Sequence, residues 1–472
     1  MTKGHIDLRH WLLRAHEANI RWQAGFGPFA VHPSTMVDGE RFETAFAEYT
    51  RRLGGSYPFF HPRYAGQMVK PPHPAAVAGY VTAMLINPNN HALDGGPATT
   101  EFEIEAVAQL AEMIGFPDSH LGHLTSSGTM ANLEALYVAE QTHPGAGVAY
   151  STDSHYTHER MCRILGLPTH PVPADAHGRM DIDALERLLQ TERIGTVVLT
   201  AGTTGLGAID PIDEALALRD RYGVRLHVDA AYGGFFAILG RAGELGLEPG
   251  PWRALGQCDS VVVDPHKHGL QPYGCGAVLF RDPRVARFFV QGSPCTYYTQ
   301  STSQRPHLGE ISLECSRAGA AAGALWLTFR VLPPTRDGLG EILAACRRAA
   351  LRSADLLAAS AELELYQRPD LDIVTYLPHV PSQRLSDLDA ACARLLVTGM
   401  DDLTDPIFLS SIQVDADAFR LRMPDAIADV PVTRVLRSVL IKPEAESYAD
   451  ELHARLGRLV TDMRQGADAP AR

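Results

Sequence analysis

The amine of Lys267 is the side-chain group in this sequence that most clearly indicates a chemical role. Lys267 follows the apolar run 260–263 and a tight turn that contains Pro265. This context predicts an amine that points into a site and not into solvent. Most lysines near strand ends are merely solvated, but a buried amine loses its proton readily and attacks carbonyl groups. The segment therefore indicates a lysine that forms a Schiff base.

Asp229 supplies a second group that strengthens this interpretation. It ends another apolar run, 226–228, earlier in the chain. A carboxylate beside a reactive lysine is what pyridoxal phosphate (PLP) requires, because it keeps the pyridine nitrogen protonated and lets the ring accept electrons from the substrate carbon. Lys267 and Asp229 together predict a PLP site.

The composition is that of an ordinary water-soluble globular protein. The chain has 472 residues, of which 45% are hydrophobic and 21% are charged. Its formal net charge of −13 argues against a nucleic-acid-binding protein, because a phosphate backbone would be repelled. The small and apolar stretch 318–329 is too short to cross a membrane and predicts a packed helix.

The cysteines indicate a reducing compartment. The chain has 7 of them, an odd number without CxxC spacing, which fits reduced thiols better than a disulfide framework or a zinc site. The first residues lack an apolar signal region. We therefore expect a cytoplasmic protein without a metal site.

The pattern of apolar and polar residues divides the chain into four stretches. Residues 1–95 hold amphipathic helical segments and a Pro/Gly/His-rich part, which suits a helical arm that reaches a partner or a site. Residues 96–334 alternate apolar runs with helices and form the expected large PLP-binding domain. Residues 335–465 are expected to form a small α/β domain, and 466–472 a polar tail.

The large domain is expected to have an α/β fold. The runs 196–200, 226–228 and 260–263 predict buried strands. Between the first two, residues 211–222 predict a helix with proline in its first turn and Gly223 just past its end. This order predicts a mostly parallel central sheet with helices on both faces, whose ligands bind where strands end.

Ser127, Gly128 and Thr129 open a predicted helix that continues through residues 134–136. Free N–H groups at a helix N-terminus attract a phosphate. An ordinary Ser/Thr helix cap is the alternative interpretation.

Two more residues lie at apparent strand ends. His155 follows the apparent strand 148–150 and either stacks on a cofactor ring or serves as a structural hydrogen-bonding group. Thr204 lies in the glycine-rich loop 202–207, where it either bonds the 3-hydroxyl or aldimine region of PLP or belongs to a simple turn.

These motifs resemble the group II PLP-dependent amino-acid decarboxylases, which include aromatic-amino-acid, histidine, glutamate and archaeal tyrosine/aspartate decarboxylases. The likeness runs from about His61 through the element 97–101 to about Arg317, and the segment 202–229 and the Asp-Pro-His-Lys block match in order and spacing. The resemblance implies the PLP-dependent transferase fold type I, which is aspartate-aminotransferase-like, with a helical N-terminal arm and a small C-terminal α/β domain.

The resemblance also implies a role for each matching residue. Lys267 would be the Schiff-base lysine, Asp229 the partner of the pyridinium nitrogen, and His155 the residue stacked on the ring. The other cofactor contacts would be Ala231 on the opposite face, Thr204 near the 3-hydroxyl, and Ser127, Gly128, Thr129 and His266 around the phosphate. Several relatives carry asparagine where this chain has Asp264. Because a carboxylate is a poor phosphate ligand, we do not assign Asp264 to the phosphate.

The implied reaction is decarboxylation of an L-amino acid to its amine and CO2 through a Lys267 Schiff base and a quinonoid intermediate. In relatives a tyrosine on a loop after the lysine strand reprotonates the substrate carbon, reaching into the neighbouring subunit. Tyr298 or Tyr297 in the stretch 295–305 would do so here, and a tyrosine that only packs the loop is the alternative. Without such an acid, decarboxylation-dependent oxidative deamination to an aldehyde becomes possible.

Two more residues are substrate candidates by resemblance. Arg317 matches an arginine near the entrance of the family's site and contacts either substrate or its loop, or forms an ion pair with Glu314 or another acid. His61 lies in the segment that resembles the wall of the substrate pocket. This segment does not identify the substrate, because relatives acting on neutral amino acids share it.

Other functions share the same residues. Another PLP-dependent carbon–carbon lyase, an aminotransferase or a desulfinase-like enzyme would also use Lys267 and Asp229. A catalytically silent binding subunit is disfavoured, because it would not need the full set with His155. The resemblance implies a homodimer with active sites at the subunit interface, a small-molecule amino-acid substrate, and neither a nucleic-acid nor a membrane partner.

Overall fold

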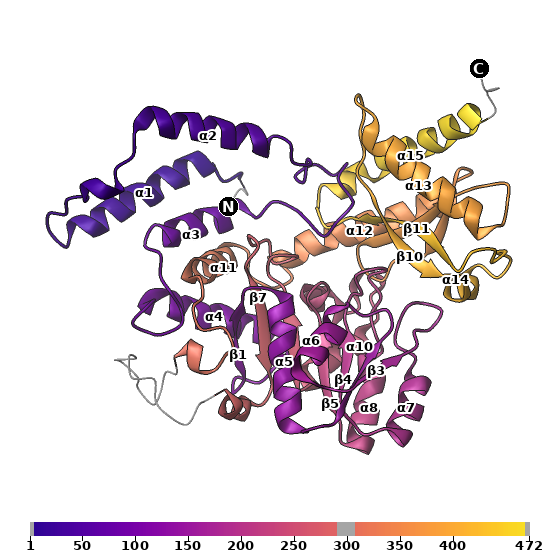
Figure 1. Cartoon of the computed structure of the whole chain (residues 1–472), viewed down its shortest axis with the longest axis horizontal. Helices are drawn as coiled ribbons and strands as arrows, with labels where there is room; N and C mark the ends of the chain where they lie inside the picture. The colour runs from indigo at the N-terminus through magenta and orange to yellow at the C-terminus, as the bar shows by residue number, and fades with distance from the viewer. Residues whose placement is uncertain (1–3, 290–306, 468–472) are drawn as a thin grey trace.

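The computed structural model describes residues 4–289 and 307–467 (Figure 1). A helical arm begins the chain, a large α/β domain follows, and a smaller domain ends it. Figure 1 shows the large sheet below the arm and the smaller domain beside both.

A seven-stranded sheet forms the centre of the large domain, in the order β1-β7-β6-β5-β4-β2-β3. β7 runs antiparallel to both of its neighbours, and the other pairs are parallel. The strands are β1 (Leu121–Thr125), β2 (Gly147–Ser151), β3 (Thr169–Val172), β4 (Ile194–Thr200), β5 (Arg225–Asp229), β6 (Ser260–Val263) and β7 (Gly276–Phe280). The predicted mostly parallel sheet is confirmed.

Alternate residues of β6 face opposite layers of helices. Val261 and Val263 pack in the cluster that contains α4 (Pro97–Ile114) and α8 (Ile212–Tyr222), whereas Val262 packs with α5 (Gly128–Thr142). Side chains alternate along a strand, so a strand with apolar residues on both faces requires cover on both faces. The prediction of helices on both faces is therefore confirmed.

The predicted C-terminal end of α8 is confirmed, and its start lies one residue later than predicted, with Pro211 as the N-cap. The helix begins at Ile212 after Pro211 and ends before Gly223, whose φ of 70° places it in the left-handed region that glycine adopts without strain. The remaining helices of this domain are α6 (Thr157–Leu165), α7 (Ile182–Thr191), α9 (Ala237–Gly240), α10 (Pro249–Ala254) and α11 (Gly319–Val331).

The smaller domain is built on a four-stranded antiparallel sheet in the order β10-β11-β9-β8. The strands are β8 (Leu363–Gln367), β9 (Ile373–Pro378), β10 (Ser410–Asp415) and β11 (Val432–Val439). Its helices are α12 (Leu339–Ala358), α13 (Leu385–Asp401), α14 (Ala416–Arg422) and α15 (Ala445–Ala467). α15 continues past the expected boundary at residue 465, and residues 468–472 of the expected tail lie outside the described residues.

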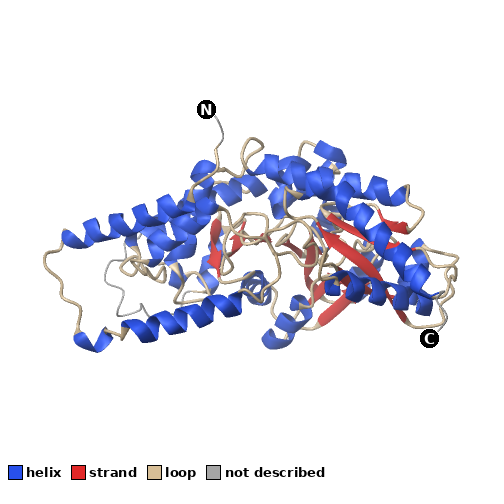
Figure 2. Ribbon diagram, turned by 90° about the horizontal axis from the view of Figure 1, so that it is seen from above, coloured by secondary structure: helices blue, strands red, loops and turns tan. Residues whose placement is uncertain are grey.

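The N-terminal arm consists of α1 (Leu8–Ala24) and α2 (Gly39–Leu53), joined to the large domain through α3 (Pro74–Met84). Figure 2 shows two long helices and their connecting loop reaching away from the sheets. α3 packs against α11, the buried helix expected at 318–329. Nowhere in the described part of the chain does a helix have the length and apolar character of a membrane span.

Buried polar groups connect the two domains. Tyr232 of the large domain donates a hydrogen bond of 2.6 Å to Asp372 Oδ1, and His268 Nε2 lies 3.3 Å from Asp372 Oδ2. Burial raises the pKa of the Asp372 carboxyl to about 6. The start of the small domain's strand β9 is thus joined to the segments that follow β5 and β6.

Substituting Ile114, which is fully buried where α4 meets the sheet, tests the position of the core. We expect Ile114→Ala to lower the free energy of unfolding by about 2–5 kcal/mol, because the lost side chain leaves a cavity. Ile164→Ala is the matched control: that side chain is 65% exposed, and its loss should cost about 0.5 kcal/mol or less. Urea unfolding followed by tryptophan fluorescence measures both. Equal losses would contradict the described packing.

Candidate active site

The carboxyl ends of five strands meet around one cavity of about 200 Å³. Residues that follow β1, β2, β4, β5 and β6 line it, as expected for a parallel sheet. They are Ser127, Gly128, Thr129, Asn132, His155, Thr157, Thr200, Gly202, Thr204, Asp229, Ala231, Tyr232, Asp264, His266 and Lys267. The structure thus brings together every cofactor residue assigned from the sequence.

Lys267 is positioned by a tight turn at the end of β6. Its backbone N–H donates to Asp264 O at 2.9 Å, and Pro265 O accepts from Gln271 at 3.1 Å. A Cβ atom on Gly269 would lie 2.7 Å from the backbone of Pro265, so only glycine lets the chain turn back this closely. The lysine side chain is 21% exposed, and its Nζ lies 3.2 Å from Asp264 Oδ2. The amine is therefore held at the cavity and stays accessible.

Asp229 is a buried carboxylate with three partners. His158 Nε2 lies 3.1 Å from Oδ2, Asn132 Nδ2 donates to Oδ2 at 3.2 Å, and the N–H of Ala231 donates to Oδ1 at 3.1 Å. Burial alone would raise the pKa of this carboxyl. His158, Lys267 and the Ala231 N–H together outweigh burial and hold the pKa well below its usual value. Asp229 is therefore ionised at neutral pH.

His227 orients one of these partners. Its Nε2 is 2.8 Å from Asn132 Oδ1, which turns the amide nitrogen of Asn132 toward Asp229. Burial lowers the pKa of His227 to about 3, so the ring is neutral. Asn132 Nδ2 also donates to Gly128 O at 2.9 Å and so connects the carboxylate to the first turn of α5.

His155 lies half-buried at the cavity. The N–H of Thr157 donates to His155 Nδ1 at 3.2 Å, so the proton of the neutral ring belongs on Nε2. Burial is the main cause that lowers the pKa of His155, and Lys267 adds to it, while Asp229 opposes both. The neighbouring Tyr156 ring lies 4.2 Å away at 31°. A neutral imidazole held in this way presents a flat face suited to an aromatic ring.

The first turn of α5 forms an anion cradle. Ser127 is the N-cap, and its Oγ accepts from the Met130 N–H at 3.3 Å, so the helix-cap interpretation is realised for this hydroxyl. The N–H groups of Gly128 and Thr129 belong to the first turn and have no acceptor inside the helix. These N–H groups remain available to bind a ligand phosphate. The helix cap and the anion cradle therefore coexist at the same turn.

His266 and Thr204 complete the polar lining. His266 Nδ1 donates to Cys275 O at 2.8 Å. The other ring nitrogen, Nε2, lies 3.5 Å from Asp264 Oδ2. Thr204 is exposed and lies beside Gly202, whose φ is 96°. A Cβ on Gly202 would meet Leu371 at 2.9 Å. The loop at the end of β4 therefore packs closely under the small domain.

Arg317 lies outside this cavity. Its side chain is 7% exposed, its Nη1 donates to Leu124 O at 2.6 Å, and it lies 3.4 Å from Glu103 Oε1. This position matches the ion-pair alternative, with Glu103 as the acid. Glu314 instead accepts from the Ser126 N–H at 2.8 Å. The structure does not support a substrate contact for Arg317. Its buried guanidinium already has Glu103 as its counter-charge and needs that partner to remain buried.

His61 does not line this cavity. His61 packs edge-on against Tyr448 of α15, with ring centroids 5.5 Å apart. Its Nδ1 accepts from the Arg63 N–H at 3.1 Å. Tyr298 and Tyr297 lie outside the described residues. The roles of His61 and Tyr298 stay predictions.

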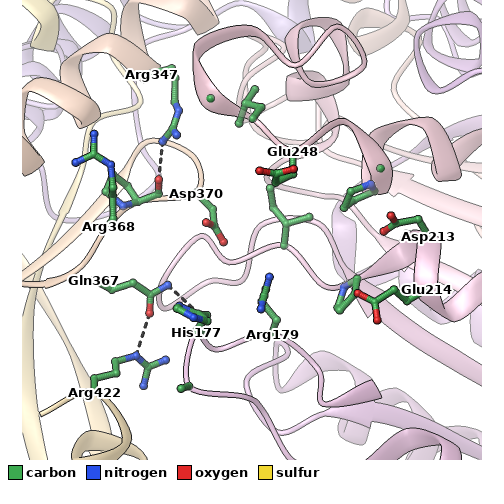
Figure 3. Close-up of a pocket in the computed structure, with 18 of the residues that line it drawn as sticks. His177, Arg179, Asp213, Glu214, Glu248, Arg347, Gln367, Arg368, Asp370 and Arg422 are labelled. Atoms are coloured by element: carbon green, nitrogen blue, oxygen red, sulfur yellow. Dashed lines mark hydrogen bonds between the residues drawn. The ribbon is translucent and has the colours of Figure 1, made fainter. Parts of the chain in front are cut away.

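A second, larger cavity of about 1000 Å³ lies between the two domains (Figure 3). Its lining is polar, with Arg347 and Arg422 on one side and Asp213 on the other. Neither Lys267 nor Asp229 reaches it. Arg347 Nη1 donates to the carbonyls of Pro369 and Leu371, at 2.7 and 2.8 Å. This cavity has no reactive lysine and is not the candidate active site.

The residues at the smaller cavity fit PLP. They offer an accessible primary amine on Lys267, an ionised buried carboxylate on Asp229, a flat neutral ring on His155 and an N–H cradle at α5. The carboxylate of Asp264 beside the cradle is the one group that does not suit a phosphate. Within the described residues, no group of three or more His, Cys, Asp or Glu side chains is placed to hold a metal ion.

Several functional neighbours were missed from the sequence. His158 and Asn132 touch Asp229, and Tyr232 lines the cavity while bonding Asp372. A signal existed for two of them. Asn132 is four residues after Gly128 on the same helix, α5, and His158 lies in the first turn of α6, shortly after His155. Nothing in the sequence near Tyr232 indicates Asp372, which lies in the other domain.

The family model described as "Pyridoxal-dependent decarboxylase conserved domain" matches residues 56–377. An L-tyrosine decarboxylase of Enterococcus faecium is 27% identical, over 87% of this chain and 84% of that protein. A probable L-tyrosine/L-aspartate decarboxylase of Methanothermobacter thermautotrophicus is 30% identical, over 69% and 87%. An L-2,4-diaminobutyrate decarboxylase of Rhizobium meliloti is 32% identical, over 64% and 63%.

Solved structures share the fold. Mouse CSAD in apo form has a TM-score of 0.76 at 22% identity, covering 95% of this chain and 98% of that chain. Oryza sativa TDC, solved with PLP and tryptamine, has a TM-score of 0.76 at 19% identity, covering 97% and 98%. The expected fold type I is thereby confirmed. Since the family match spans well over half of the sequence, this chain belongs to the family of pyridoxal-dependent decarboxylases.

Proposed function

We propose that this chain removes the carboxyl group of an L-amino acid as CO2 and releases the corresponding amine, with PLP held by Lys267. The observation that carries the proposal is the meeting of Lys267, Asp229 and His155 in one cavity. Membership of the pyridoxal-dependent decarboxylases supports the same reaction. The relatives act on different amino acids by their names, so the substrate is left open.

Each of the three residues has a distinct task in this proposal. When bound, PLP supplies a ring that draws electrons away from the carbon that loses CO2. Lys267 provides the amine that holds the cofactor's aldehyde. Asp229, ionised and buried, holds a proton at the ring nitrogen. His155 lays its neutral ring against the cofactor and leaves its Nε2 proton for a polar partner.

The last step needs an acid that returns a proton to the substrate carbon. We assign this step to Tyr298, in agreement with the resemblance. If no tyrosine protonates this carbon, decarboxylation-dependent oxidative deamination to an aldehyde becomes possible, with dioxygen as the oxidant and the amine nitrogen released as ammonia. The products distinguish the two reactions.

We also propose that the chain works as a homodimer with its active sites at the interface. α2 buries none of its residues within one chain. Phe42, Phe46, Tyr49 and Leu53 form an apolar stripe on it and are between 51% and 61% exposed. An arm with such a stripe is expected to pack on a partner.

A reducing compartment is proposed from the thiols. The described cysteines are all unpaired, and five of them are buried: Cys162, Cys258, Cys275, Cys346 and Cys392. Burial raises the pKa of each of these thiols, which keeps them protonated and unreactive. We therefore propose a cytoplasmic location.

The function is tested by incubating the PLP-loaded protein with each L-amino acid, together with cysteine sulfinate, 2,4-diaminobutyrate and DOPA. We expect one substrate class to yield CO2 and its amine in equal amounts without a keto-acid acceptor. An aldehyde with CO2 would point to oxidative deamination. Visible cofactor absorbance with no CO2 from any compound would contradict the proposal and favour another lyase or an aminotransferase.

The cofactor's attachment point is tested in the same protein. The chain's lysines are Lys3, Lys70, Lys267 and Lys442, so borohydride reduction followed by peptide mapping gives an unambiguous answer. We expect the label on Lys267, and Lys267→Ala should lose both the visible absorbance and the CO2. Unchanged absorbance in that variant would show that the central assignment is wrong.

Asp229→Asn tests the role of the carboxylate. We expect the rate of CO2 release to fall by about 100-fold or more, because a neutral amide cannot hold a proton at the ring nitrogen. The variant should still bind PLP, as its absorbance will show. Asp213→Asn, in the second cavity, is the matched control and should keep the wild-type rate. Similar rates in the two variants would exclude the assigned role.

The dimer is tested by adding charge to the apolar stripe of α2. We expect Phe42→Asp combined with Phe46→Asp to give a monomer in light scattering and to weaken PLP retention, because a shared site is lost with its partner. Thr44→Asp combined with Ala47→Asp adds the same charge to the opposite side of α2 and should leave the dimer intact. A double variant of the stripe that remains dimeric would refute this interface.

A further inference from the structure

Asp264 places a carboxylate inside the segment that we assign to the cofactor's phosphate. It directly follows β6 and is 3% exposed. A Cβ atom on Gly128 would lie 2.6 Å from Asp264 Oδ2, and one on Gly276 would lie 3.0 Å from Oδ1. The carboxylate therefore packs against the first turn of α5, where a residue larger than glycine would not fit.

The groups that satisfy Asp264 come from its own turn. Lys267 Nζ lies 3.2 Å from Oδ2, and His266 Nε2 lies 3.5 Å from the same oxygen. Oδ1 is buried and finds no hydrogen-bond partner in the described part of the chain. Leaving a buried oxygen unpaired is costly, so Asp264 is in a strained position before any ligand arrives.

The neighbouring elements bring acids rather than bases. Tyr273 and Cys275, just before β7, both face Asp264; burial raises the pKa of each, and the carboxylate raises it further. Glu103 of α4 acts on Cys275 in the same direction. Asp229 ends the adjacent strand β5. The first turn of α5 contributes only N–H groups and hydroxyls.

A phosphate bound to this turn has to lie beside the carboxylate. Two anions repel each other strongly in a buried site of low dielectric, and this disfavours the ionised form of one of them. Asp264 has little room to withdraw, because its N–H donates to Ala231 O at 3.3 Å and the close turn at Gly269 fixes the backbone that follows. Neutralising one of the two anions removes the conflict.

We propose that Asp264 takes up one proton from solvent when the cofactor's phosphate binds, and that the neutral acid then donates a hydrogen bond to the phosphate. This releases Lys267 from its ion pair at the moment the cofactor arrives. Uptake of one proton changes the affinity by at most about tenfold per pH unit, so the affinity for the phosphate falls as the pH rises. The inference rests on the proposed function, since PLP is the ligand.

Pyridoxamine 5′-phosphate is the probe for the test, because it carries the phosphate but cannot form a Schiff base with Lys267. Its dissociation constant for the apoprotein is measured by equilibrium dialysis between pH 7 and pH 9, in the wild type and in Asp264→Asn. The ratio of the two constants cancels the ionisation of the ligand itself. We expect the variant to bind more tightly, with an advantage that grows as the pH rises, by at most about tenfold per pH unit.

Two controls locate the effect. Pyridoxamine, which lacks the phosphate, should bind both proteins with a ratio that does not depend on pH. Asp213→Asn, in the second cavity, should behave as the wild type with either ligand. Circular dichroism checks that each variant is folded, and Asp264→Ser provides a second neutral side chain if the asparagine variant does not fold.

A ratio that stays constant with pH, or weaker binding in both neutral variants, would overturn the inference. The same result with pyridoxamine as with its phosphate would also overturn it, because the conflict is with the phosphate. Failure of the proposed function has different signatures: no CO2 from any tested compound, or a wild-type protein that gives no visible absorbance with PLP at any pH.

Discussion

The active site depends on one ionised carboxylate, that of Asp229, which is held in the protein interior. An ionised carboxylate is stable in an interior only where donors surround it, and Asp229 has three, each from a different segment. His158 comes from α6, Asn132 from α5, and Ala231 from the turn after β5 itself. These contacts to the carboxylate therefore fix the positions of α5 and α6 against the ends of the central strands. The cavity has its shape because those helices cannot shift without exposing the charge.

The fold was predictable wherever a local pattern decided it. Apolar runs predicted β4, β5 and β6, because a strand covered on both faces carries mostly apolar residues along its length. Pro211 and Gly223 marked the ends of α8 through their own backbone preferences. Lys267, Asp229 and His155 follow such strands directly, so the sheet edge that collects them could be expected. The proline-containing turn before Lys267 pointed in the same direction.

What could not be predicted involves partners that are distant in sequence. The sequence left Arg317 open between a substrate contact and an ion pair, and it could not identify Glu103, far earlier in the chain, as the counter-charge. Tyr232 contacts the cavity and also Asp372, and neither residue carries a local sign of the other. His61 lies against Tyr448 of the last helix. Such pairs are set by how distant segments pack, within a domain or between domains, which a single sequence does not encode in any short pattern.

The segment 369–372 connects the second cavity with the first. Arg347 holds the carbonyls of Pro369 and Leu371, and Asp372 then accepts from Tyr232, which lines the cofactor cavity. This segment acts as a strut between the two cavities. A change in the small domain can therefore reach the chemistry through a few residues of backbone. Natural variants that damage the enzyme need not cluster at the cofactor, and some should fall along this strut.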